Sequence, residues 1–131
     1  MFHFWRATLN DFLQTSELID WQNPSVFAKA KQLAANESDP LKIIAACFRF
    51  VRDDIKHTGD FKLDKVTASA SEVLQIGTGY CYSKSHLLAA LLRANNVMTG
   101  LCYQRLALDN DATRFCLHGL NAVYLENGGW F

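Results

Sequence analysis

Cys81 is the residue whose type and position point most directly to chemistry. It follows Gly77 and Gly79 and precedes a run of strong helix formers, so the sequence predicts a helix that begins at Cys81 and ends near residue 95. The first N–H groups of a helix have no internal acceptor, and the aligned peptide dipoles place partial positive charge there. This field favours a thiolate, and the same N–H groups can stabilise the oxyanion that forms when sulfur attacks a carbonyl. The alternative interpretation is an ordinary buried cysteine.

A cysteine nucleophile needs a base within reach, and His118 is the best-placed candidate. His3 falls in a terminal arm and His57 in a polar loop. His86 lies on the same predicted helix as Cys81 but points away from it around the helix axis. His118 lies on a predicted strand that can pack against the start of the helix, and Gly119 leaves space beside it. The alternative interpretation is a histidine hydrogen-bonded within the sheet.

The elements that would position this pair follow from apolar spacing and turn residues. Asn-Pro and Asp-Pro pairs and an S-x-x-E box mark helix starts, and Gly77 marks a helix end. Helices are predicted for residues 24–35, 40–56, 72–76 and 81–95, and strands for residues 97–108, 115–125 and from 130 onward. Residues 57–65 are predicted to form a loop and 126–129 a hairpin turn. The aromatic-rich residues 1–23 suggest a strand or an extended arm.

Composition bounds the class of protein. The 131 residues are half apolar and one-fifth charged, with a formal net charge of zero, which is typical of one globular domain and gives no basic surface for nucleic acid. No apolar run approaches the roughly 20 residues of a membrane span, and no secretion signal is recognised, so a cytoplasmic protein is expected. The remaining cysteines, Cys47, Cys102 and Cys116, form no C-x-x-C pair with Cys81 or one another, and disulfides are not expected.

Several of these segments together resemble the transglutaminase-like superfamily, whose bacterial core domains are related in fold to papain-like cysteine peptidases. The specific part is Gly79-Tyr80-Cys81, followed by the apolar run of residues 87–94, the strand headed by His118, and Gly-Gly-Trp at 128–130. Segments 18–20, 50–55 and 67–74 are also similar, so the resemblance covers roughly residues 15–131. It implies an α+β fold, in which a helical N-terminal part and a central buried helix pack on a C-terminal antiparallel sheet. It also implies one domain over residues 1–131.

The resemblance assigns roles to individual residues. It implies Cys81 as nucleophile and His118 as general base and acid. The family's third member is an aspartate on the strand after the tryptophan, which would lie just past Phe131, so a C-terminally truncated domain is expected. Gln75, six residues before Cys81, stands at the spacing of the oxyanion-hole glutamine of papain-like enzymes. Tyr80 and Tyr82 flank the sulfur and are candidates for lining the substrate groove, although packing roles explain them equally well.

Three hypotheses follow for function. The first is a thiol hydrolase or acyltransferase that acts on peptide or glutamine-type amides through a thioester, with hydrolysis favoured over cross-linking. The second is an inactive peptide-binding or structural domain on the same scaffold. The third, a zinc site made by Cys81, Cys116 and His118, lacks a fourth ligand. No cofactor is expected, the expected partner is a peptide or protein amide rather than nucleic acid or membrane, and an exposed sheet edge suggests strand-mediated self-association.

Overall fold

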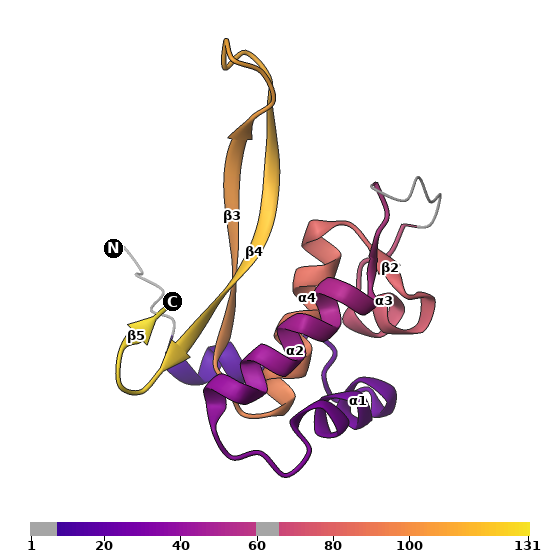
Figure 1. Cartoon of the computed structure of the whole chain (residues 1–131), viewed down its shortest axis with the longest axis vertical. Helices are drawn as coiled ribbons and strands as arrows, with labels where there is room; N and C mark the ends of the chain where they lie inside the picture. The colour runs from indigo at the N-terminus through magenta and orange to yellow at the C-terminus, as the bar shows by residue number, and fades with distance from the viewer. Residues whose placement is uncertain (1–7, 60–65) are drawn as a thin grey trace, which may run out of the picture.

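The computed structural model describes residues 8–59 and 66–131, and it confirms the predicted α+β fold (Figure 1). Four helices and a long hairpin make up most of the molecule: α1 (Pro24–Ala34), α2 (Pro40–Asp54), α3 (Ala70–Ile76), α4 (Cys81–Ala94), β3 (Thr99–Ala107) and β4 (Phe115–Leu125). All six lie within a few residues of their predicted bounds, because each begins or ends at a strong local signal.

The starts of α1 and α2 show how these signals work. Asn23 precedes Pro24 and accepts hydrogen bonds from the N–H groups of Ser25 and Val26, while Asp39 precedes Pro40 and accepts one from Leu41. A cap satisfies donors that the helix leaves unpaired, and proline lacks the N–H that would otherwise be orphaned.

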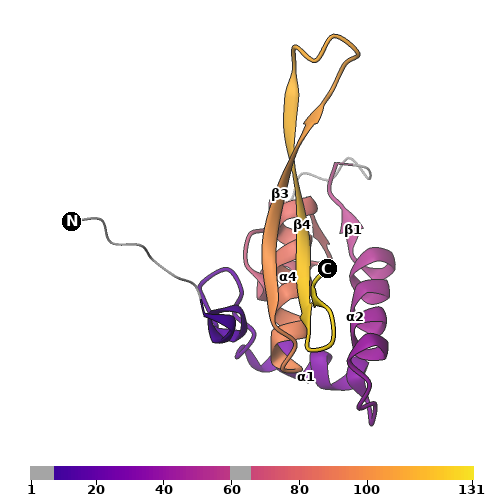
Figure 2. The same ribbon diagram turned by 90° about the vertical axis from the view of Figure 1, so that its left-hand side faces the viewer.

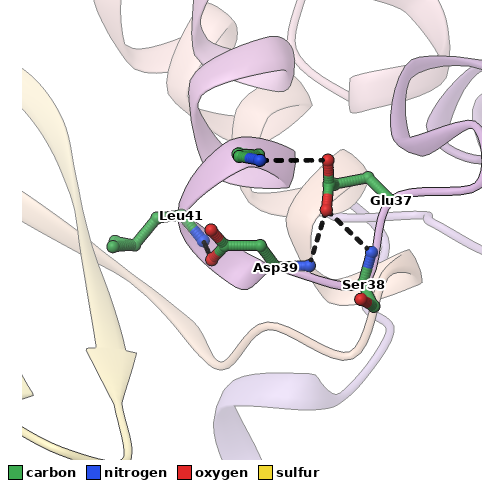
Figure 3. A network of polar contacts seen from close by, with 5 residues as sticks. Glu37, Ser38, Asp39 and Leu41 are labelled. Carbon is green, nitrogen blue, oxygen red and sulfur yellow. Dashed lines mark hydrogen bonds and ion pairs between the residues drawn. The ribbon is translucent and has the colours of Figure 1, made fainter.

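A carboxylate in the preceding turn orders the entry to α2. Glu37 accepts from the N–H groups of Ser38 and Asp39 at 3.1 and 3.0 Å, and Lys42 lies 3.9 Å from its other oxygen (Figure 3). The turn therefore enters α2 in one conformation, although the exposed ion pair itself adds little stability.

Helix α4 lies at the centre of the molecule. It contacts α1, α2 and α3 on one side and the β3–β4 hairpin on the other (Figure 2). Leu87, Leu91 and Leu92 are fully buried, as are Ala89 and Ala90. The prediction of a helix that is apolar nearly all round and buried is therefore confirmed, and this position fixes Cys81 at the end of a rigid element.

The C-terminal sheet has the strand order β3-β4-β5 and is antiparallel throughout. The short strand β5 (Gly129–Trp130) follows the predicted turn, in which Gly129 has a φ of 84°, and pairs with the end of β4. The Trp130 ring of β5 packs on the Phe12 ring, with the two centroids 4.7 Å apart. The outer half of the β3–β4 hairpin projects beyond the helices in both views (Figures 1 and 2).

Two sequence predictions are corrected. Residues 56 and 57, expected at the end of a helix and the start of a loop, form the strand β1 (Lys56–His57). It pairs in parallel with β2 (Thr78–Gly79), for which no strand was predicted, because the Lys56 and Thr58 N–H groups bond to the carbonyls of Gly77 and Gly79. The N-terminal segment contains a 3-10 helix, η1 (Leu9–Leu13), rather than a strand. Residues 1–7 of the predicted arm and 60–65 of the predicted loop lie outside the described residues.

Among residues 8–59 and 66–131, no helix is both long enough and apolar enough to cross a bilayer.

Candidate active site

The sulfur of Cys81 lies at the first residue of α4. Gly77 ends α3 in the left-handed region, β2 follows, and Tyr80 is the N-cap of α4 in an extended conformation. Cys81 is thus at the positive end of a buried helix dipole, as the sequence predicted. The turn that precedes Cys81 therefore holds the sulfur in one position.

A cluster of buried hydroxyl groups fixes this turn. The Thr67 hydroxyl donates to the Thr78 carbonyl at 2.9 Å and lies 3.3 Å from the Ser83 hydroxyl, which donates to the Tyr80 carbonyl at 3.1 Å. Thr78 also shares a 2.9 Å hydrogen bond with Thr58. Because buried polar groups are costly unless paired, this network specifies one path for the chain into Cys81.

Gly79 is required by the same cluster. A Cβ at this position would lie 2.5 Å from the Ser83 hydroxyl oxygen and 3.1 Å from that of Thr67. The glycine therefore allows the hydroxyl cluster to pack against the backbone just before the sulfur.

Strand β4 contacts the first turns of α4 at Gly119 and Asn121. The Gly119 N–H donates to Cys81 Sγ at 3.4 Å, and a Cβ on Gly119 would lie 2.9 Å from the Cα of Tyr82. One turn further on, Asn121 donates its amide to the Ser85 carbonyl at 3.0 Å, and the Ser85 hydroxyl donates to the Cys81 carbonyl at 2.8 Å. These contacts hold β4 against the first turns of α4, with His118 immediately before Gly119 in the strand.

Cys81 and His118 line one cavity of about 490 Å³ between α2, α4 and β4. Its other polar lining residues include Lys84, His57 and Arg52, and the remaining surface is mainly apolar, from Ile44, Phe48, Val51, Leu88, Leu92, Leu120, Val123 and Phe131. Lys84 follows Cys81 by one helical turn and donates from Nζ to the Ile55 carbonyl at the end of α2 at 2.6 Å. The sulfur therefore opens into a mostly apolar trough with basic groups near it.

A second cavity of about 610 Å³ lies elsewhere, between the start of α2, the end of α4 and the β4–β5 turn. Asp39, Asn95 and Glu126 are among its polar lining residues. Neither Cys81 nor a histidine lines this larger cavity, so cavity size alone does not identify the reactive site.

The other predicted site residues lie away from this cavity. Gln75 is exposed on α3 and is not among the lining residues. Tyr80 and Tyr82 stack on each other with centroids 6.2 Å apart, and Tyr82 packs edge-on against the buried His86. Cys81 and His118 thus line one cavity, and the other three candidates are not among its lining residues.

The remaining thiols differ sharply from Cys81 in their surroundings. Cys47 is fully buried on α2, and burial raises the pKa of its thiol to about 11, which keeps it protonated. Cys116 is exposed on β4 and Cys102 is half-buried on β3. Across residues 8–59 and 66–131, no three His, Cys, Asp or Glu side chains gather as a metal-ligand set, so Cys81, Cys116 and His118 do not form one.

Two residues of the site were missed at the sequence level. His57 was assigned to a solvated loop, but it lies on β1, lines the cavity and packs edge-on against Tyr80 at 5.6 Å. Lys84 was passed over, although its spacing of three from Cys81 is the signal that places both on one side of a helix.

Comparison with known proteins identifies the family to which this fold belongs. The profile of the transglutaminase-like superfamily matches residues 28–131. The chain belongs to the transglutaminase-like superfamily. No curated protein matches it.

Solved structures resemble this transglutaminase-like chain at low sequence identity. A candidate cysteine protease from Cytophaga hutchinsonii has a TM-score of 0.73 at 17% identity, covering 93% of this chain and 39% of its own. The periplasmic domain of TgpA from Pseudomonas aeruginosa has a TM-score of 0.70 at 18% identity, covering 94% and 44%. A candidate protease from Parabacteroides distasonis has a TM-score of 0.60 at 13% identity, covering 93% and 24%. The transglutaminase-like chain therefore shares their fold and spans less than half the length of each.

Proposed function

We propose that this chain is a thiol hydrolase that acts on peptide or glutamine-type amides through a thioester on Cys81. The observation that carries the proposal is the shared cavity of Cys81 and His118 at the N-terminus of α4, with the Gly119 N–H on the sulfur at 3.4 Å. A sulfur at the positive end of a helix, an imidazole beside it and unpaired helix N–H groups are the parts that acyl transfer needs.

The proposed reaction has two halves. The Cys81 thiolate attacks the amide carbon, and the developing oxyanion is stabilised by N–H groups of the first turn of α4. His118, which takes the proton of the Cys81 thiol, gives it to the departing amine as the C–N bond breaks and the thioester forms. His118 then takes a proton from water, whose oxygen attacks the thioester, and returns it to the sulfur as the C–S bond breaks, so that the acid and the free thiol are released.

Hydrolysis is proposed over cross-linking because water reaches the site. The His118 side chain is exposed and Cys81 is half-buried at the edge of an open trough. An enzyme that transfers acyl groups to amines must keep water from the thioester, and an enclosed site is the usual means.

Acylation of Cys81 by an activated ester tests this proposal. Intact-mass and peptide-mapping spectrometry of the 131-residue chain should find one transient adduct, on Cys81, that decays in water. Cys81→Ala should abolish it, whereas Cys116→Ser, which removes the exposed thiol, should leave it unchanged. An adduct confined to Cys116, or equal labelling in Cys81→Ala, would overturn the proposal.

One observation favours the second candidate, an inactive peptide-binding domain. The His118 side chain is exposed to solvent, so packing does not hold the imidazole in one orientation. A third group that orients the imidazole is worth up to roughly four orders of magnitude in turnover in the serine-protease triad. Peptide binding without any acyl adduct on Cys81 would establish this candidate.

A further inference from the structure

Strand β4 and helix α4 are joined by two polar contacts whose spacings match. The Gly119 N–H donates to Cys81 Sγ at 3.4 Å, and the Asn121 side-chain amide donates to the Ser85 carbonyl at 3.0 Å. Two residues of a strand advance by about 6.8 Å, and four residues of a helix advance by about 6.0 Å. The two contacts therefore fix one register of the strand along the helix, and the strand follows the helix over this turn (Figure 2).

The face of β4 that meets α4 carries Gly119 and Asn121. Side chains two residues apart on a strand share a face. A Cβ on Gly119 would lie 2.9 Å from the Cα of Tyr82, so this face is pressed against the helix. The glycine allows the close approach, and Asn121 supplies the next side chain along the same face.

Asn121 provides the stronger of the two contacts. A thiol sulfur is a weak hydrogen-bond acceptor, whereas an amide N–H on a carbonyl at 3.0 Å has the usual length of a protein hydrogen bond. Asn121 is also the one residue with a polar side chain in the sequence of residues 119–123. A neighbour on the strand therefore has no group that can replace its amide.

The acceptor of this hydrogen bond is tied to the nucleophile. The Ser85 hydroxyl donates to the Cys81 carbonyl at 2.8 Å, within the turn of α4 that joins the two residues. The Cys81 sulfur and the Ser85 carbonyl thus belong to one turn of a buried helix. Any shift of β4 along this turn changes the position of His118 relative to the sulfur.

We propose that Asn121 is a positioning residue for acylation, which acts through His118 by holding β4 in register on the first turns of α4. This inference rests on the proposed function, since it gives Asn121 a part in the chemistry of Cys81. Without the amide, the strand can slide or lift, and the imidazole loses its fixed distance from the sulfur. A displacement of about 1 Å can cost roughly 100-fold in rate, so a small movement of the strand is enough.

The first test compares two asparagines that donate to carbonyls of α4. Asn121→Leu keeps the approximate shape of the side chain and removes the donor, and it should slow acylation of Cys81 by an activated ester roughly tenfold or more. Asn95→Leu is the matched control, because the Asn95 amide donates to the Leu91 and Ala30 carbonyls at the other end of α4. It should leave the acylation rate unchanged, and circular dichroism should show both variants folded.

A double-mutant cycle separates positioning of the base from general damage to the fold. In a His118→Ala background, Asn121→Leu should cause no further slowing, because the ring whose position it controls is absent. A residue that only supports the sulfur or the fold would slow acylation by the same factor with and without His118. That result would overturn the proposal.

Hydrogen exchange tests the register without any reaction. Deuterium exchange of the Gly119 N–H, followed by NMR, should be roughly tenfold faster in Asn121→Leu and unchanged in Asn95→Leu, because the strand opens locally from the helix. Equal protection of Gly119 in the parent and in Asn121→Leu would overturn the proposal. A parent chain that forms no adduct on Cys81 would instead refute the proposed function, and the exchange rates would still decide whether Asn121 holds the strand.

Discussion

The two halves of the candidate site are held in different ways. The sulfur side is fixed from within: Cys81 begins a buried helix, and a hydroxyl network that includes Thr67 and Thr78 sets the turn before it. The histidine side is fixed by two contacts of β4 with α4, the Gly119 N–H on the Cys81 sulfur and the Asn121 side-chain amide on the Ser85 carbonyl, while the His118 ring remains exposed. The nucleophile is therefore preorganised, and the base depends on how closely one strand approaches one helix.

Removing the base gives the largest effect expected after loss of the sulfur itself. His118→Ala should lower the rate of Cys81 acylation by about 10²–10⁴-fold, which is the usual contribution of a positioned general base. Stopped-flow measurement of the acylation burst checks this. His57→Ala is the matched control, because His57 lines the same cavity from β1, and it should lower the rate far less. An equal loss in both variants would contradict the assignment of the base.

Widening the gap between β4 and α4 gives the next largest effect. Gly119→Ala places a methyl group 2.9 Å from the Tyr82 Cα, so the strand must move away and the His118 ring with it. We expect a loss of roughly 1–3 kcal/mol in the free energy of unfolding and a slower acylation. Gly100→Ala, whose Cβ would meet the Phe12 ring at 3.3 Å and the Trp130 ring at 3.9 Å, should change acylation little. Urea unfolding and burst kinetics on both variants distinguish them.

Cutting the hydroxyl network tests the sulfur side. Thr67→Val keeps the shape of the side chain but removes the donor to the Thr78 carbonyl, which leaves a buried acceptor unpaired. The expected cost is about 1–3 kcal/mol of unfolding free energy, measured by urea titration. A variant as stable as the parent would show that the network does not fix the turn.

A smaller effect concerns pH and the buried thiol of Cys47. Burial raises its pKa from an ordinary value of 9.0 to about 11, so the folded state disfavours the thiolate more than the unfolded state does. The contribution to stability is complete below pH 9 and is lost as pH rises through about 11. Unfolding free energy should therefore fall more steeply across this window in the parent than in Cys47→Ala, and parallel curves would contradict the prediction.

Local signals in the sequence predicted most of the fold. Asn23, Asp39, Ser69 and Gly77 mark helix ends by chemistry that acts within a few residues, and each acts in the structure as predicted. The strands β1 and β2 were missed because each has only two residues, and their pairing depends on contact between distant parts of the chain. Neither propensity nor periodicity records such a contact.

The candidate site was predictable to the same limit. The sequence predicted Cys81 from its position at the start of a helix and His118 from the family resemblance. Lys84 and His57 were not predicted, because they reach the cavity only through the packing of α2, α4 and β1. Gln75 was a candidate because of its spacing of six residues from Cys81. That spacing does not place it near the sulfur, because Gln75 lies on α3.

The most direct test of the account is the rate at which iodoacetamide alkylates Cys81 at neutral pH, with Cys116→Ser as background. A sulfur activated by a helix terminus and a neighbouring imidazole should react at least about tenfold faster than an unactivated exposed thiol, and His118→Ala should remove most of that advantage. A Cys81 that reacts no faster than Cys116 in the parent chain, and at the same rate without His118, would contradict the central claim.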